Sequence, residues 1–221
     1  MLRPDAVASP WRTKNQEPYI SPRSVPTSKS IVEIYDETDG ELLLLGEPGA
    51  GKTTLLLELT QELVERCRHN ETLPMPVIFH LSGWTEKKAP LAVWLAEELN
   101  LKYQVPLQIA QKWIADDQIL PLLDSLDEVG QAVRPACIEG INAYRKEHGF
   151  IPMVVCCRTS DYDSLSERLV LGMAIVVQPL TFQQIDDYIS KNSKDLATMR
   201  TAFRQIRPCK KSSRRHSCSI F

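Results

Sequence analysis

Eight consecutive residues in the first quarter of the chain have the types and spacing that bind a chain of phosphates. They read G-E-P-G-A-G-K-T and satisfy the pattern G-x-x-x-x-G-K-[ST] at every defined position. Their glycines let the backbone curl so that successive N–H groups point at an anion. Lys52 is expected to reach the β- and γ-phosphates and the Thr53 hydroxyl to ligate Mg²⁺. The predicted nucleotide-binding residues are Gly46, Glu47, Pro48, Gly49, Ala50, Gly51, Lys52, Thr53 and Thr54.

A second group of candidate residues lies in the run LDSLDE, which follows an apolar segment. Asp124 is expected at the carboxyl end of a strand, where ligands bind in parallel sheets, and would hold Mg²⁺ directly or through water. Ser125 is small and leaves space beside the metal. Asp127 and Glu128 follow, and one of them, with Glu128 favoured, would polarise a water molecule towards the γ-phosphate. The alternative is a strand that ends in solvated acids.

Arg158 is a candidate cation at the end of another apolar run, MVVCC. If this run is a strand of the same sheet, the arginine lies at the same edge as the acids and would sense the γ-phosphate. The alternative is a surface salt bridge with a nearby acid such as Asp161 or Asp163. The sequence therefore predicts three catalytic residues, Asp127, Glu128 and Arg158, and two metal ligands, Thr53 and Asp124.

Apolar runs alternate with helical patterns along most of the chain, which predicts an α/β fold with a parallel sheet covered on both faces. Pro121 is unfavourable in one of these strands, because proline removes a donor from the ladder. Strands are expected near 41–45, 75–83, 118–124, 153–158 and 174–180. Helices are expected near 28–35, 51–68, 89–100 and 106–115, through 148 after the LDSLDE run, and over 183–204.

Length and composition indicate one globular domain with two short appendages. Residues 1–30 contain five prolines and are expected to form a linker, residues 31–205 the domain, and residues 206–221 an irregular basic tail. The net charge of −2 gives no sign of a nucleic-acid partner. No apolar stretch is long enough to span a bilayer, so no membrane partner is expected. The cysteine pattern suits a reducing, cytoplasmic compartment.

Four segments together resemble the NACHT group of signal-transduction ATPases, within the STAND class of P-loop proteins, and in detail its bacterial branch: GEPGAGKTTLLLEL, LLDSLDEV, VVCCRTSDY and QPLTFQQIDDYI. The resemblance implies a P-loop NTPase fold, a three-layer α/β/α arrangement with a five-stranded parallel sheet in the order 5-1-4-3-2. It places Arg158 in the first sensor position, and the family tolerates a proline like Pro121. It also implies ATP and Mg²⁺ as cofactors, slow hydrolysis, oligomerisation through this domain and, for bacterial members, a role in defence.

Complete members of this group continue into helical and winged-helix domains, which 221 residues do not accommodate. Helical periodicity is lost after about Gln205, so we expect a truncated product, frame-shifted near Ile206. Two alternatives to a signalling switch stay open at this stage. One is a stand-alone P-loop kinase or GTPase, although the run Asn192–Asp195 places its lysine one position too late for N-K-x-D. The other is a non-catalytic remnant.

Overall fold

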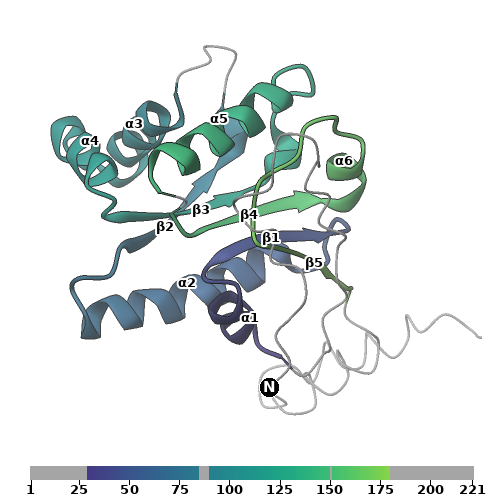
Figure 1. Ribbon diagram of the computed structural model, residues 1–221, viewed down its shortest axis with the longest axis horizontal. Coiled ribbons are helices and arrows are strands. Elements are labelled where there is room, and N and C mark those ends of the chain that lie inside the picture. Colours follow the sequence, from purple (N-terminus) through teal and green to yellow (C-terminus); the bar gives the residue numbers. More distant parts are fainter. Residues whose placement is uncertain (1–28, 85–89, 150, 180–221) are drawn as a thin grey trace, which may run out of the picture. The chain divides into compact units, whose positions relative to one another are not determined.

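A computed structural model describes residues 29–84, 90–149 and 151–179 (Figure 1). These residues all belong to the first of the two units into which the chain divides, Met1–Pro179. The predicted helix over 183–204, the basic tail 206–221 and all but the last two residues of the linker 1–30 lie outside the described residues. The limits of the predicted domain at 31 and 205 therefore stay predictions.

The described residues form a five-stranded parallel sheet in the order β2-β3-β4-β1-β5. Read from its other edge, this is the order 5-1-4-3-2, so the predicted α/β fold and its strand order are confirmed. The strands are β1 (Glu41–Gly46), β2 (Met75–His80), β3 (Ile119–Asp124), β4 (Met153–Arg158) and β5 (Met173–Val177).

Helices cover both faces of the sheet, and alternate residues of each central strand point to opposite faces. In β1, Leu42 and Leu44 belong to one hydrophobic cluster, with residues of α1 (Ile31–Glu37) and α2 (Lys52–His69). Leu43 and Leu45 belong to the other cluster. That second cluster includes residues of α3 (Leu91–Tyr103), α4 (Leu107–Ala115) and α5 (Arg134–Glu147). Figure 1 shows the resulting three layers.

Three short elements follow strand ends, and the sequence did not predict them. The second strand ends at His80 rather than 83, because Leu81–Gly83 forms a 3₁₀ turn, η1. A second 3₁₀ turn, η2 (Leu126–Glu128), follows β3, and the five-residue helix α6 (Thr159–Asp163) follows β4. η1 and α6 follow their strands directly and η2 begins one residue after β3, so each of these short elements lies at the carboxyl end of a strand.

Pro121 does lie within β3, between β2 and β4 in the sheet. The ladder with β2 pairs Val77 with Pro121, whereas the ladder with β4 contains only Leu122 and Leu123, both after the proline. The missing N–H is therefore accommodated by shortening one of the two ladders.

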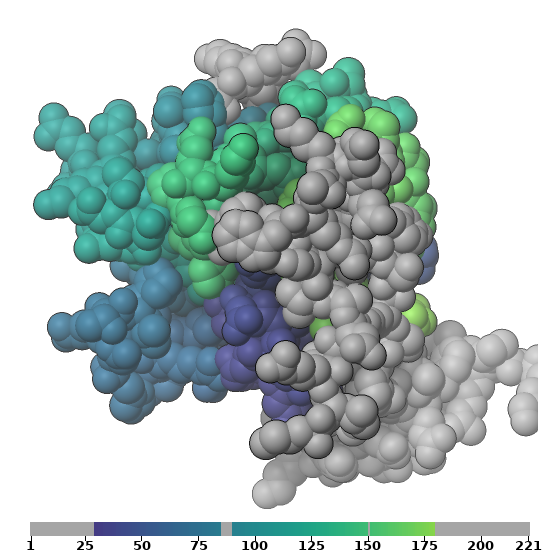
Figure 2. All heavy atoms as spheres, in the orientation of Figure 1, coloured from purple at the N-terminus to yellow at the C-terminus, as the bar shows by residue number. Residues whose placement is uncertain are grey.

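Among the described residues, the α3–α4 helix pair carries most of the large exposed apolar side chains, and Figure 2 shows its atoms in teal above the blue atoms of α2. These side chains are Val93, Leu101, Tyr103, Leu107 and Ile109.

In the part of the chain that the structure describes, no helix combines the length and apolar character needed to cross a membrane.

The turn between α1 and β1 fixes where the first strand begins. Gly40 has a φ of +77°, its N–H donates to the Tyr35 carbonyl, and its carbonyl accepts from the N–H of Met153 at the start of β4. A Cβ at this position would lie 2.7 Å from Cβ of Pro152 and 2.8 Å from the Tyr35 hydroxyl oxygen. Close approach of three segments therefore requires glycine here.

We expect Gly40→Ala to destabilise the protein more than Gly149→Ala. Gly149 has a similar φ of +66°, but none of the residues that the structure describes lies within 4 Å of an added Cβ. The left-handed backbone costs an alanine about 1–2 kcal/mol at either position. Overpacking should add about 1–3 kcal/mol at Gly40 alone. Urea unfolding measures the difference in the free energy of unfolding. Equal losses of this free energy in the two variants would show that Pro152 and Tyr35 move aside for the added methyl group at little cost.

Candidate functional site

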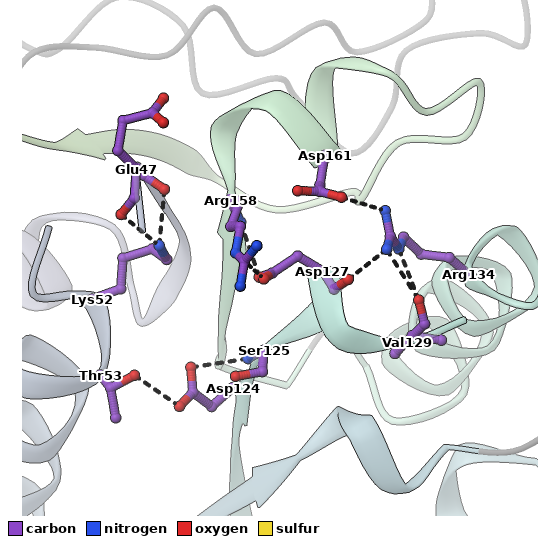
Figure 3. A network of polar contacts seen from close by, with 11 residues as sticks. Glu47, Lys52, Thr53, Asp124, Ser125, Asp127, Val129, Arg134, Arg158 and Asp161 are labelled. Atoms are coloured by element: carbon purple, nitrogen blue, oxygen red, sulfur yellow. Dashed lines mark hydrogen bonds and ion pairs between the residues drawn. The ribbon is translucent and has the colours of Figure 1, made fainter. Parts of the chain in front are cut away.

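The candidate residues meet because three strands end at one edge of the sheet. Gly46 at the end of β1 is in register with Arg158 at the end of β4. Leu123, one residue before the end of β3, is in register with Val155 of β4. The phosphate-binding pattern, the acidic run and the arginine therefore share the carboxyl edge, as the sequence predicted (Figure 3).

The loop after β1 turns the chain into α2 and holds the side chain of Lys52. Gly51 is the residue before the helix and has a φ of +99°, a conformation that glycine adopts without strain. The Lys52 ammonium donates to the carbonyl oxygens of Gly46, at 2.8 Å, and Glu47, at 3.2 Å. The first N–H groups of α2 have no intrahelical acceptor, and the helix dipole favours an anion there. The loop therefore presents both a cation and amide donors.

Thr53 and Asp124, the two predicted metal ligands, are in direct contact. The Thr53 hydroxyl donates to Oδ2 of Asp124 at 3.1 Å, and the N–H of Ser125 donates to Oδ1 at 2.9 Å. His80, at the end of β2, places Nδ1 3.7 Å from the same Oδ2 and is half exposed. A hydroxyl and a carboxylate oxygen are the donors that Mg²⁺ prefers, so the residues present fit this ion.

Asp124 has two further neighbours, the next residue in the chain, Ser125, and Cys156 of β4. Ser125 adopts a left-handed backbone, with φ 62° and ψ 48°, which is uncommon outside glycine and bends the chain away from the strand. Behind the carboxylate lies Cys156, which is fully buried. Burial, followed by the charge of Asp124, raises the pKa of the Cys156 thiol, so this group stays protonated.

Asp127 is held by β4 and does not face a free space. Its carboxylate accepts from the N–H of Arg158 at 3.0 Å and from Nε of the same residue at 2.7 Å. Its side chain is only 6% exposed. The salt bridge considered for Arg158 therefore exists, but its partner is Asp127 and not Asp161 or Asp163. Both oxygens of Asp127 have donors, which leaves this acid poorly suited to orienting water.

Glu128 differs from its neighbour, because its side chain points to solvent. The residue is exposed, and no hydrogen bond or ion pair within residues 29–84, 90–149 and 151–179 involves its carboxylate. Of the two acids that the sequence offers for polarising water, Glu128 is the one whose oxygens are available.

Arg134, the first residue of α5, belongs to the same network, and sequence reasoning missed it. Its guanidinium donates to backbone carbonyls of the acidic run and to Asp161 of α6, as Figure 3 shows. A signal was present in the sequence. Pro135 favours a helix start at this point, which places Arg134 in the first turn of the helix that follows the acidic run.

The fold and the arrangement of its strand-end residues define a nucleotide-binding P-loop NTPase. The NACHT domain model matches residues 41–195, and the chain belongs to the NACHT family. No curated protein matches the sequence.

Two solved structures from Aeropyrum pernix share the fold. The ORC1 protein, solved in complex with DNA, is 16% identical over 71% of this chain and 44% of its own, with a TM-score of 0.51. The ORC2 protein, solved as ADPNP-ADP complexes, is 12% identical over 81% of this chain and 54% of its own, with a TM-score of 0.50. The chain thus spans about half the length of these two proteins. At such identities the likeness concerns the fold alone.

The two adjacent acids should respond differently to truncation. Asp127→Ala removes the acceptor of a part-buried N–H and of a guanidinium, so we expect it to cost about 1–3 kcal/mol of unfolding free energy. Glu128→Ala removes an exposed side chain without partners and should stay within about 0.5 kcal/mol of the parent. Chemical denaturation of both variants without nucleotide measures the contrast. Similar stabilities would mean that the contact between Asp127 and Arg158 adds nothing to the fold.

Proposed function

We propose that the chain is a Mg²⁺-dependent ATP-binding module that hydrolyses ATP slowly and acts as a nucleotide-controlled signalling switch. The observation that carries this proposal is the contact between Thr53 and Asp124, 71 positions apart in the sequence. It brings two oxygen ligands of the kind that Mg²⁺ selects next to a loop that presents Lys52 and helix amides. A chance glycine-rich turn would have no reason to meet a buried carboxylate.

Each of the remaining site residues has a role in this proposal. Lys52 leaves the carbonyl oxygens of its own loop and binds the β- and γ-phosphates, because a charge-assisted contact with phosphate is stronger than one with a neutral carbonyl. Thr53 and Asp124 hold Mg²⁺, which neutralises charge on the phosphates when it is bound. Glu128 accepts a hydrogen bond from the attacking water. Gly46, Gly49 and Gly51 let the backbone follow the phosphates.

Arg158 provides the sensing step. Its side chain is 43% exposed although its Nε is paired with Asp127. A γ-phosphate carries more negative charge than one carboxylate and competes for this guanidinium. Loss of the γ-phosphate on hydrolysis returns Arg158 to Asp127. The state of the nucleotide is thereby linked to the contact between the ends of β3 and β4.

The proposal also includes a biological role, a cellular compartment and partners. The resemblance to bacterial NACHT proteins supports a role in defence and oligomerisation with further copies of this chain. The free state of Cys67, Cys137, Cys156 and Cys157 suits the cytoplasm. The partners expected are ATP and ADP. We propose no nucleic-acid partner, because the net charge of −2 gives no clear sign of one.

Titration of the 221-residue chain with radiolabelled ATP and GTP tests the proposal. We expect ATP binding that weakens when EDTA removes Mg²⁺, and turnover well below one per second. Rapid turnover that depends on an added metabolite would favour a kinase. A preference for GTP would favour a GTPase, and no binding would favour a non-catalytic remnant.

Lys52→Ala should lower the affinity for MgATP at least about tenfold, because a charge-assisted contact to phosphate contributes about 1.5–3 kcal/mol. Lys112→Ala is the matched control, since Lys112 is an exposed lysine on α4, which leads to the start of β3 and not to its carboxyl end. Isothermal titration measures both. If Lys52→Ala binds as tightly as the parent chain, the phosphates do not bind in this loop.

Glu128→Gln should slow single-turnover hydrolysis about a hundredfold while MgATP affinity changes little, because general-base assistance contributes about 10²–10⁴ in rate. The amide keeps the size of the side chain and removes its charge. Hydrolysis is followed with the protein in excess of γ-labelled ATP, so that each site turns over at most once. A rate equal to that of the parent chain would remove Glu128 from this role.

A further inference from the structure

Arg134 is a buried cation whose three guanidinium nitrogens all donate to the acidic run or to α6. Nε donates to the Val129 carbonyl at 3.2 Å, and Nη2 donates to the same carbonyl at 3.0 Å and to the carbonyl of Asp127. Nη1 contacts Oδ1 of Asp161 at 3.1 Å. The side chain is 7% exposed. Burying a cation is costly unless its donors are satisfied, and here the acceptors are mainly backbone oxygens of one short turn.

The two carbonyls that Arg134 holds stand on either side of Glu128. The N–H of Glu128 donates to the Ser125 carbonyl at 3.0 Å, which closes η2. The backbone around this residue is therefore fixed before it, after it and at its own amide. Its side chain has no partner of its own in the part of the chain that the structure describes. The backbone contacts therefore set the direction of the Cα–Cβ bond, from which the side chain extends.

A second link ties this turn to β4. Asp127 of the turn accepts from Arg158 of β4, and Arg134 of α5 pairs with Asp161 of α6, so two ion pairs of opposite orientation link the segments after β3 with those around the end of β4. Figure 3 shows Asp127 between the two arginines, with its carboxylate towards Arg158 and its carbonyl towards Arg134. A shift of the turn relative to β4 would break the pair between Asp127 and Arg158, because one partner lies in the turn and the other at the end of β4.

We propose that Arg134 is a positioning residue for hydrolysis, which aims the Glu128 carboxylate by clamping the carbonyls of Asp127 and Val129. This inference rests on the proposed ATPase function. It adds to that function a residue that does not touch nucleotide and acts through the backbone of the water-orienting acid. Lysine cannot replace it, because a single ammonium does not reproduce a planar fork with donors in fixed directions.

The test is Arg134→Lys in the 221-residue chain, compared with the parent in single-turnover hydrolysis and in MgATP binding. We expect the rate to fall at least about tenfold, because small misplacements of a catalytic group cost up to about a hundredfold. The affinity for MgATP should stay within about twofold, since the phosphate loop and metal ligands are untouched.

The decisive measurement is the same substitution in a Glu128→Gln background. Once the carboxylate is gone, aiming it has no value, so Arg134→Lys should lower the residual rate less than about twofold. Equal losses in both backgrounds would overturn the proposal, because they would show that Arg134 acts independently of Glu128.

Arg168→Lys is the matched control. This arginine also donates to two backbone carbonyls, those of Tyr162 and Asp163, but among the described residues it makes no hydrogen bond or ion pair with the acidic run. Its substitution should leave the hydrolysis rate within about twofold of the parent. An equal loss in Arg168→Lys would show that the rate responds to general destabilisation, which contradicts a specific role for Arg134.

Asp161→Asn provides a milder second variant if Arg134→Lys does not fold. It removes the charge that faces Nη1 and leaves the carbonyl contacts in place, and we expect a loss of about two- to fivefold that also disappears in the Glu128→Gln background. A parent chain that binds no ATP or never hydrolyses it would overturn the proposed function and this inference together. A parent that hydrolyses ATP, with a slow Glu128→Gln variant and fast Arg134→Lys and Asp161→Asn variants, would overturn the inference alone.

Discussion

The rest of the structure depends on a parallel sheet that is buried on both faces. Within β1, β3 and β4, every residue from Leu42 to Leu45, from Ile119 to Leu123 and from Met153 to Cys157 is buried. A charge in such a segment would be buried without water, at a cost of several kcal/mol. The polar groups of these strands are therefore confined to their ends. Because the strands are parallel, the carboxyl ends all come to one edge, which brings Gly46, Asp124 and Arg158 together.

The same constraint explains why the site is a network rather than a set of separate side chains. Asp124, Asp127 and Arg134 are close enough to the core to lose most of their contact with water. Each is satisfied by fixed donors or acceptors: a hydroxyl and an N–H for Asp124, an N–H and a guanidinium for Asp127, and backbone carbonyls and a carboxylate for Arg134. Removal of one partner would leave the other as a buried polar group without a hydrogen bond, which costs free energy. These residues therefore stabilise the geometry as a group.

Features encoded by contiguous residues could be predicted from the sequence, and contacts between distant side chains could not. The phosphate loop, the five strands and Asp124 at a strand end follow from local patterns of apolar residues and glycines. The partner of Arg158 could not be predicted, because Asp127, Asp161 and Asp163 are all acids expected near the same sheet edge and the sequence does not show which of them contacts the arginine. Ser125 was explained by space beside the metal, whereas the structure adds a left-handed backbone. The limits at 31 and 205 cannot be compared with the described residues.

The geometry of η2 explains how one short run supplies three different acids. A 3₁₀ turn advances by about 120° per residue, so consecutive side chains leave it in different directions. Asp124 ends the strand and faces Thr53, Asp127 turns inward to β4, and Glu128 turns outward to solvent. Asp127 pairs with Arg158 and lies in the same turn as Glu128, so a force on Arg158 acts on the segment that carries Glu128. In the proposed function, a γ-phosphate that draws Arg158 away from Asp127 would therefore also change the position of the acid proposed to orient water.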